Sequence, residues 1–499
     1  MARGRPIRLG PPSAGFYAVS SPLLSPDRTL CSGKNVYIRK QDYSVAVRPG
    51  LQLISSISST NYPVISGTYF ASENWNRVVV AVTSGNEWYA SIDDGEFVNI
   101  SSSSLLQEVS HTSFVPFFYD SKVWIHGCNG KTGILRWNTS QSQISEISGS
   151  PVLHDMTLCA GRIIGIDAVN FSVRWSAVND PTVWPANAYF VLPSMGKPVT
   201  IKPLTRNIVA VFTESDIYLI YPAGNTDATA FRFEYFGTSS PPLSPVACFN
   251  FSNVLYYLTP DNVVYFFDGS SIRRISAPIE NVTRRLTNVR AWLSGDISSK
   301  YVFLGYPKDG TCIVFPYDVE TNIWNPPWIF PYEITVCTPA LIVRGYTWGD
   351  LSSWTWGQLG LRKWEEFTPR SFPGIVLIDV NGKEMTLSGS TDTGSSLSWS
   401  FVFNPIVSDP SLMFSIDMVE AIMSADPSTP VTIRLGLSYD LMEPIMWETA
   451  GQIQREKAVK RNLDAPPVRV IMVECSGTSY IDSAICGANV YVYEKKVYL

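Results

Sequence analysis

Charge and histidine are both scarce in this sequence. Of its 499 residues, 16% are charged and 45% are hydrophobic, whereas charged residues average roughly 25% of soluble domains. This composition excludes a disordered chain. The three histidines, His111, His126 and His154, have spacings that fit no helical zinc pair such as HExxH. We therefore expect neither a metal nor a cofactor.

Neither sign of charge dominates. The 38 Lys and Arg residues stand against 43 Asp and Glu residues, which leaves a net charge of −5. A protein that holds DNA tightly needs cations to neutralise phosphates, so any contact with DNA is expected to be loose and without sequence specificity. The apolar stretch Ile208–Tyr221 is interrupted at Thr213–Asp216 and falls short of the roughly 18 residues that cross a membrane as a helix. No membrane span is expected.

The short motifs of catalysis and export are also missing. There is no Gly-x-Ser-x-Gly elbow, no phosphate loop and no Gly-x-Gly-x-x-Gly, so no catalytic or cofactor-binding residue is predicted and we expect a protein that is not an enzyme. The basic N-terminus leads into Pro, Ser and Gly rather than the apolar core of a secretory signal. Eight scattered cysteines contain no CxxC pair, which predicts buried free thiols.

What the sequence does contain is one kind of strand at a fixed period. An apolar run that follows a basic or amide residue recurs six times, at steps of 45, 40, 45, 46 and 47 residues. Blades of four-stranded propellers repeat every 40 to 50 residues. The six runs are Arg77–Val82, Lys122–Ile125, Arg162–Ile166, Asn207–Phe212, Asn253–Leu258 and Lys300–Leu304.

A second strand that carries an aromatic residue follows each run after a turn. A four-stranded sheet cannot bury both faces alone, so repeated sheets are expected to stack around an axis. A series of β-sandwiches is the alternative, but sandwiches rarely keep one period over about 270 residues. The second strands are Glu87–Ile92, Gly133–Trp137, Phe171–Trp175, Asp216–Tyr221, Asn262–Phe267 and Cys312–Tyr317.

Toward both ends of the chain the regular repeat of strands is lost. We predict an all-β protein with an N-terminal arm at 1–30, a β-propeller of about six to eight four-stranded blades at 31–390, and a C-terminal β-sandwich-like domain at 391–499. The runs at Val36–Ile38 and Tyr43–Val47 are expected to help close the propeller ring. A Trp-rich insertion at about 344–370 precedes a last hairpin at Ile375–Lys383, whose Asn-Gly pair is a turn signal.

Helices are predicted at only three places. They are expected around Ile279–Leu286, Leu412–Met423 and Gln452–Arg461, because elsewhere the sequence lacks a helical repeat of apolar residues.

The most distinctive local string is Arg-Trp-Ser-Ala-Val-Asn-Asp-Pro-Thr-Val-Trp. Here a strand is expected to end at Trp175 and a turn to follow at Asp180-Pro181, so that Trp175 and Trp184 pack on either side of it. The string includes the candidate structural residues Arg174, Trp175, Ser176, Asp180, Pro181 and Trp184.

Four features in order give the chain a family resemblance. It resembles the propeller-containing tail nozzle proteins of short-tailed bacteriophages, the group of the tail tubular protein B and packaged-DNA stabilisation proteins. The resemblance covers roughly residues 36–380. The features are Arg48-Pro49-Gly50-Leu51, the Arg174–Trp184 string, the stretch with Tyr317, Asp318 and Trp324, and the Trp-x-x-Leu passage with Trp348 and Trp356.

The resemblance implies a structural virion protein with no catalytic residues. Members of the group form homohexameric rings below an adaptor (head-to-tail connector) protein on the portal. The implied role is to continue the channel for DNA ejection and to help retain the packaged genome. Implied partners are further copies of the chain, the adaptor, a tail fibre or tail needle protein, and double-stranded DNA in transit. The implied location is the virion tail, after assembly in the host cytoplasm.

Two other functions stay open. A kelch-like interaction scaffold would bind peptides at one propeller face, although the doubled glycines of kelch blades are missing. A glycan-processing propeller would use paired carboxylates, with Asp93 and Glu365 as candidates. Ser91–Gly95 has the opening Ser and Asp of an Asp-box but lacks its closing Thr-Trp, which favours a simple tight turn.

Overall fold

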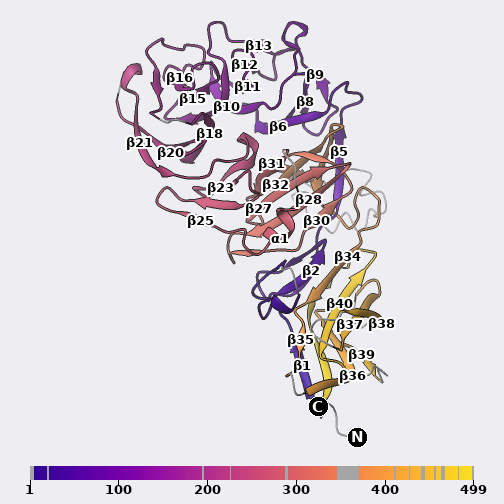
Figure 1. Ribbon diagram of the computed structural model, residues 1–499. Coiled ribbons are helices and arrows are strands. Elements are labelled where there is room, and N and C mark those ends of the chain that lie inside the picture. Colours follow the sequence, from indigo (N-terminus) through magenta and orange to yellow (C-terminus); the bar gives the residue numbers. More distant parts are fainter. Residues whose placement is uncertain are drawn as a thin grey trace, which may run out of the picture.

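The computed structural model describes residues 5–18, 22–193, 196–224, 226–286, 290–344, 370–409, 412–425, 427–439, 444–453, 457–461, 467–481 and 483–496. Over these residues the fold is a seven-bladed β-propeller joined to a β-sandwich (Figure 1). Each blade is an antiparallel sheet of four strands, and one blade holds a fifth. The predicted fold class is confirmed, with seven blades inside the expected range.

The first strand of each blade lies innermost. Neighbouring first strands contact one another around a closed circle, because each blade buries its faces against the two adjacent blades. Numbered in chain order, blades 1 to 7 have as their innermost strands β6 (Val64–Ala71), β10 (Ser113–Tyr119), β14 (Leu153–Cys159), β18 (Pro198–Thr205), β22 (Cys248–Phe251), β26 (Trp292–Asp296) and β31 (Ile334–Arg344).

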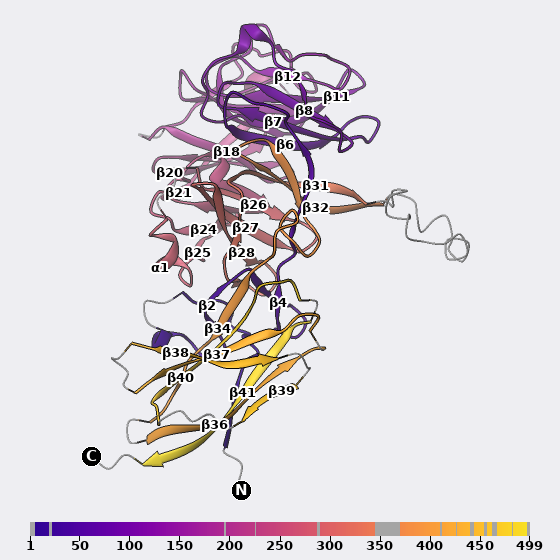
Figure 2. The same ribbon diagram turned by 90° about the vertical axis from the view of Figure 1, so that its right-hand side faces the viewer.

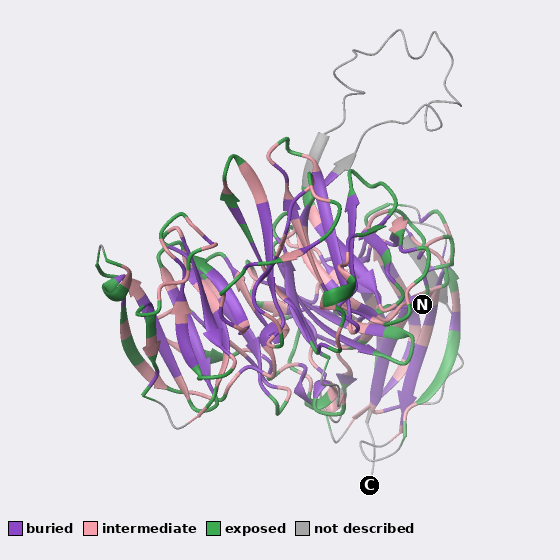
Figure 3. Cartoon of the chain, turned by 90° about the horizontal axis from the view of Figure 1, so that it is seen from above, coloured by how far each residue is buried: buried purple, intermediate pink, exposed green. Residues whose placement is uncertain are grey.

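The periodic strands of the sequence are the second and third strands of the blades. The second strands are β7 (Arg77–Thr83), β11 (Lys122–Cys128), β15 (Arg162–Asp167), β19 (Ile208–Thr213), β23 (Val254–Leu258), β27 (Tyr301–Lys308) and β32 (Arg370–Asp379). The third strands are β8 (Trp88–Ile92), β12 (Leu135–Trp137), β16 (Ser172–Trp175), β20 (Asp216–Pro222), β24 (Val264–Phe267), β28 (Thr311–Asp318) and β33 (Lys383–Leu387). These strands are the most buried, so they carry the strongest apolar signal. Figure 3 shows in purple how buried residues fill the interior of the blades.

The outermost strands are more exposed than the others, and all but β5 and β21 have only two or three residues. They are β9 (Val98–Asn99), β13 (Ser145–Glu146), β17 (Tyr189–Val191), β21 (Phe231–Thr238), β25 (Ile272–Arg274), β29 (Ile323–Trp324) and β5 (Leu51–Ser56), and β30 (Trp328–Phe330) also pairs with β28. Strand β5 comes from the N-terminal part of the chain and completes the last blade in the order β31-β32-β33-β5. Ring closure therefore uses both ends of the repeat, as expected, but through 51–56 rather than 36–47.

The sandwich is built from both ends of the chain. One sheet holds β3 (Val36–Ile38), β4 (Val45–Val47), β41 (Ile485–Lys496), β36 (Leu412–Met423) and β39 (Lys457–Arg461), with β1 (Arg5–Leu9) paired to β41. The other holds β2 (Leu30–Lys34), β34 (Trp399–Phe403), β40 (Val470–Gly477), β37 (Val431–Ser438) and β38 (Met446–Ile453), with β35 (Ile406–Val407) on β40.

This arrangement corrects the predicted boundaries. Residues 5–9 are a sandwich strand rather than part of an arm, and 30–47 belong to the sandwich rather than to the propeller. Strands β1 and β2 have pairing partners more than 350 residues away, for example Leu30 opposite Phe403. Strands β3 and β4 form a local hairpin, and what places it in the sandwich is the pairing of Val45 with Ile485 of β41. The C-terminal β-rich region is present as predicted, with N-terminal strands added to it.

Only one of the three predicted helices forms. The short helix α1 (Glu280–Thr283) lies inside the predicted Ile279–Leu286, and 3₁₀ turns occur as η1 (Pro22–Leu24), η2 (Ser103–Leu105), η3 (Asp227–Thr229) and η4 (Pro245–Ala247). The predicted helix at 412–423 is strand β36, in which buried and half-buried residues largely alternate and the pairing with β41 shifts register at two places. The predicted helix at 452–461 is the end of β38 followed by β39, so strand pairing overrides the weak helical pattern.

One hairpin projects from the propeller. Strands β31 and β32 remain paired as far as Arg344 opposite Arg370, whereas β33 pairs only with Leu377 and Ile378 of β32. Figure 2 shows this hairpin extending beyond the blades. The predicted Trp-rich insertion at about 344–370 falls between these two strands, and residues 345–369 lie outside the described part of the chain. Among the described residues, none of the helices has the length and apolar character needed to cross a membrane.

Candidate functional site

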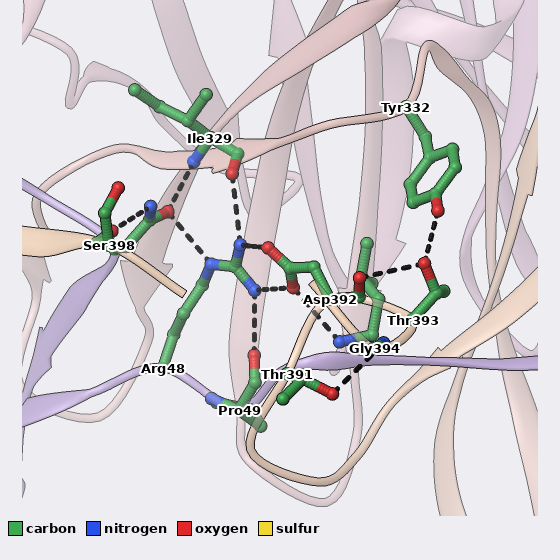
Figure 4. A network of polar contacts seen from close by, with 11 residues as sticks. Arg48, Pro49, Ile329, Tyr332, Thr391, Asp392, Thr393, Gly394 and Ser398 are labelled. Atoms are coloured by element: carbon green, nitrogen blue, oxygen red, sulfur yellow. Dashed lines mark hydrogen bonds and ion pairs between the residues drawn. The ribbon is translucent and has the colours of Figure 1, made fainter. Parts of the chain in front are cut away.

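The Arg48-Pro49-Gly50 motif lies where the chain crosses from the sandwich into the propeller. The Arg48 side chain is fully buried and forms a bidentate ion pair with Asp392, with Nη1–Oδ1 and Nη2–Oδ2 distances of 2.9 and 2.7 Å (Figure 4). Asp392 stands on the segment by which the chain returns from the propeller to the sandwich. The ion pair therefore ties together the two crossings between the domains.

Every remaining donor of Arg48 is also engaged. Nε donates to Asn35 Oδ1 at 2.9 Å, Nη1 to the Pro49 carbonyl at 2.9 Å and Nη2 to the Ile329 carbonyl at 3.0 Å. The guanidinium lies 4.6 Å from the centre of the Phe330 ring. Burial lowers the pKa of Arg48, and the Asp392 carboxylate opposes that shift. Such full pairing is what a buried charge requires to be stable.

Asn35 extends the Arg48 network into the sandwich. Its side-chain amide donates to the Ser398 carbonyl at 2.7 Å, and its Oδ1 accepts the Ile329 N–H at 2.7 Å (Figure 4). Gly50 is required in this network because a Cβ there would lie 2.0 Å from the Thr391 carbonyl oxygen. Asn35 between β2 and β3, Ile329 of β30 and both crossing segments thus meet at one point.

The Arg174–Trp184 string forms a corner between blades. Trp175 is buried against Phe231 of blade 4, and its Nε1 donates to the Asp227 carbonyl at 2.7 Å. Trp184 packs instead on the cluster between blades 2 and 3, and its Nε1 donates to the Pro181 carbonyl at 3.0 Å. The string therefore joins three consecutive blades.

The polar residues of the string shape the same corner. Asp180 Oδ1 accepts the backbone N–H of Thr182 at 2.9 Å, and the Ser176 carbonyl accepts Arg162 Nη1 at 2.8 Å. Arg162 also pairs with Asp227 of blade 4 at 2.6 Å. Arg174 lies 3.6 Å from Asp167 within its own blade. These contacts are structural, and none of them leaves a reactive group aimed at a cavity.

The Tyr317–Trp324 stretch is a second joint. Trp324 packs at 5.0 Å on Tyr317, and its Nε1 donates to the Ile275 carbonyl of the preceding blade at 2.7 Å. The carbonyl of Trp324 accepts the N–H of Phe16, a residue of the sandwich side, at 2.9 Å. Asp318 is buried and lies 3.3 Å from Lys40 Nζ. Trp348 and Trp356 lie outside the described residues.

Lys40 makes a contact between the sandwich and the propeller that the sequence pattern does not indicate. It stands between β3 and β4 of the sandwich and reaches blade 6, where its Nζ donates to Glu320 at 2.8 Å and to the Ser299 carbonyl at 2.7 Å. It also lies 5.2 Å from the centre of the Tyr301 ring. A lysine in a polar turn carries no signal of a distant acidic partner, so only the tertiary structure identifies this contact.

The central cavity of the propeller is small and nearly neutral. It has a volume of about 420 Å³, within the range of small-molecule sites rather than of a polymer channel. Among the described residues Lys202 is the one charged residue on its lining, and Asp155 neutralises it at 3.2 Å. Burial raises the pKa of Asp155, but Lys202 and three hydrogen-bonding neighbours outweigh that effect and lower it overall.

Two of the histidines and the candidate carboxylate Asp93 make contacts within the fold. His111 Nε2 lies 2.7 Å from the His154 carbonyl, and burial lowers the pKa of both rings. Asp93 Oδ1 accepts the backbone N–H of Arg77 at 2.8 Å inside the Ser91–Gly95 turn, while Glu365 lies outside the described residues. Within the described part of the chain, no group of three or more His, Cys, Asp or Glu residues is placed to hold a metal ion.

Comparisons with known proteins assign neither a family nor a role to the chain. No family model matches the sequence, and no curated protein matches it. Among solved structures, the chain is similar to the computationally designed protein Ika8, with 10% identity over 70% of this chain and 96% of that one and a TM-score of 0.37.

Proposed function

We propose that this protein is a structural subunit of a phage tail nozzle, in which copies of the chain form a ring that continues the DNA-ejection channel below the adaptor and helps retain the packaged genome. The observation that carries the proposal is the Arg48–Asp392 network. This network links the propeller to the sandwich at both chain crossings. A tail component that transmits force between neighbouring subunits requires such a link.

The family motifs support the same proposal. Arg48–Gly50, Arg174–Trp184 and Tyr317–Trp324 all occupy joints, either between blades or between the two domains. A role built into joints is the one expected of a structural component, whereas motifs of an enzyme converge on a cavity.

The small central cavity supports a channel outside the propeller in the proposed ring. With about 420 Å³ and a Lys202–Asp155 pair at its wall, the propeller itself does not pass a DNA duplex. In the proposed ring the lumen therefore lies between subunits. The chain's net charge of −5 suits a wall along which phosphates slide, since a wall rich in Lys and Arg would hold them.

Electron microscopy of the purified chain, alone and with its adaptor partner, tests the proposal. The expected result is a ring with an open centre, six subunits in the family's pattern. A particle that stays monomeric at micromolar concentration, with and without the adaptor, would contradict it. A monomer that instead captures a peptide at one propeller face would favour the kelch-like scaffold, and hydrolysis of sialosides or polysaccharides would favour the glycan-processing alternative.

A further inference from the structure

Strand β21 is an unusually long open edge. It spans eight residues, Phe231–Thr238, whereas at the same position of other blades β5 spans six and β9, β13, β17, β25 and β29 span two or three. In the described structure its one hydrogen-bonded neighbour is β20. The other side of the strand lies at the rim of the propeller, away from the sandwich (Figure 1). An edge of this length is a template for another strand.

The side chains of β21 divide into a charged face and an aromatic face. Arg232 and Glu234 lie on one face, 3.6 Å apart, with 67% and 58% of their side chains exposed. Phe231 and Phe233 point to the other face, where Phe233 stacks on Phe190 at 4.0 Å. Tyr235 is 55% exposed at the end of this regular stretch, before the bulge at Ile217/Tyr218 of the partner strand.

This pattern is complementary to itself. If two copies of β21 pair antiparallel about Phe233, Arg232 of each copy stands opposite Glu234 of the other. The same register places Phe231 opposite Tyr235 and Phe233 opposite its own copy. Directly opposed residues of an antiparallel pair are close enough to interact, and opposite charges or aromatic pairs stabilise it.

We propose that β21 is a two-fold interface at which a second copy of this chain adds its own β21 to the edge of blade 4, so that two blades form one continuous sheet. Such a contact is isologous, with the same patch used by both copies. It does not rest on the proposed nozzle function, because a ring built through another surface can also pair back to back through β21.

Edge protection is the competing explanation for Arg232 and Glu234, since charges on an edge strand often prevent pairing. Protection works best with one sign of charge, which repels an identical strand. Here the two signs stand two residues apart on one face, so an identical antiparallel strand meets attraction at both positions. The charges therefore favour this partner over a strand of arbitrary sequence.

Charge-reversal variants test the interface. Arg232→Glu and Glu234→Arg each place two like-charged pairs across the two-fold axis, and each is expected to weaken the dimer about 10-fold or more. An equimolar mixture of the two variants restores complementary pairs and is expected to dimerise. The double variant Arg232→Glu/Glu234→Arg should behave like the wild type. Arg273→Glu, an exposed arginine on the outer strand of the next blade, is the matched control that should leave dimerisation unchanged.

Mass photometry and sedimentation over a range of protein concentrations read out the particle mass. A mass that halves in each single variant and recovers in the mixture supports the interface, whether the wild-type particle is a dimer or a pair of rings. A wild type with no two-fold association at 100 times the concentration used for photometry, or single variants that associate as well as the wild type, would overturn it. Failure of ring formation with an intact β21 dimer would count against the nozzle and leave this interface standing.

Discussion

At the residue scale, the decisive positions of this molecule are buried charges whose partners lie far away in the sequence. Arg48 pairs with Asp392, and Arg77 pairs with Glu384 across the seam between the first and last blades. The motif that contains Arg48 is visible in the sequence, but Asp392 stands in an ordinary turn of Ser, Thr and Gly. Nothing local assigns it to Arg48, because the pairing arises only when the ring closes.

Arg48→Ala should destabilise the protein strongly. The change leaves the Asp392 carboxylate buried without its cation, and removing one partner of a buried pair costs about 3–5 kcal/mol. Denaturant unfolding measures the loss. Arg5→Ala is the control, since the Arg5–Glu494 pair is exposed on both sides and should be worth less than about 1 kcal/mol. Equal losses in the two variants would show that the Arg48 network does not hold the fold.

His126 should make the protein sensitive to mild acid. Burial, and next the Arg136 guanidinium, lowers the pKa of this ring from 6.5 to about 3. The folded state keeps His126 neutral while the unfolded chain takes up a proton below pH 6.5. The stability that His126 contributes is therefore complete above pH 6.5 and falls by about 1.4 kcal/mol per pH unit down to pH 3.

His126→Leu removes this titration. The free energy of unfolding, measured with urea, should fall from pH 7.5 to pH 5.5. The fall should be larger for the wild type than for the variant by about 1 kcal/mol. A difference between the two proteins that is the same at both pH values would contradict the assignment.

At the element scale, the sequence pattern predicts the six periodic hairpins but not β5, the strand that closes the ring. The hairpins repeat the same turn and apolar pattern because each buries two faces between neighbours, and the structure has all six as second and third strands. Strand β5 has the burial pattern Beeiie, which is too weak to mark it as part of a blade. Its role follows from its position beside β33.

Leu51→Ala should weaken ring closure. Leu51 is 1% exposed in β5 and belongs to the core between blades 6 and 7, so its truncation should cost about 2–4 kcal/mol. Leu53→Ala on the same strand is the matched control, because Leu53 is 47% exposed and should change stability by less than about 1 kcal/mol. Thermal unfolding of the two variants side by side checks the prediction, which fails if Leu53→Ala is as damaging as Leu51→Ala.

At the scale of the whole molecule, the propeller and the sandwich share one core. A single buried cluster contains Val302 and Trp324 of blade 6 together with Leu9, Trp399 and Val490 of the sandwich. Trp328 Nε1 of blade 6 also donates to the Val36 carbonyl of the sandwich at 3.0 Å. The sandwich takes strands from both chain ends and is therefore discontinuous in sequence, whereas the propeller strands from β5 to β33 lie in one stretch between its two parts.

Calorimetry should therefore show one cooperative transition. We expect the calorimetric and van't Hoff enthalpies to agree for the full chain, since unfolding the sandwich exposes core residues of blades 5 and 6. Two resolved transitions, with the sandwich melting first and the propeller intact, would refute this shared core.

The sequence by itself determined the all-β class, the blade period and the positions of the most buried strands, because these depend on local alternation and on turns that repeat along the chain. The tertiary structure alone decided which edge strand closes the ring, where the two chain ends go and which acid meets Arg48. Those choices depend on contacts between residues hundreds of positions apart, and such contacts leave no local pattern to read. For the same reason, the local sequence of β36 predicts a helix, whereas its pairing with β41 makes it a strand.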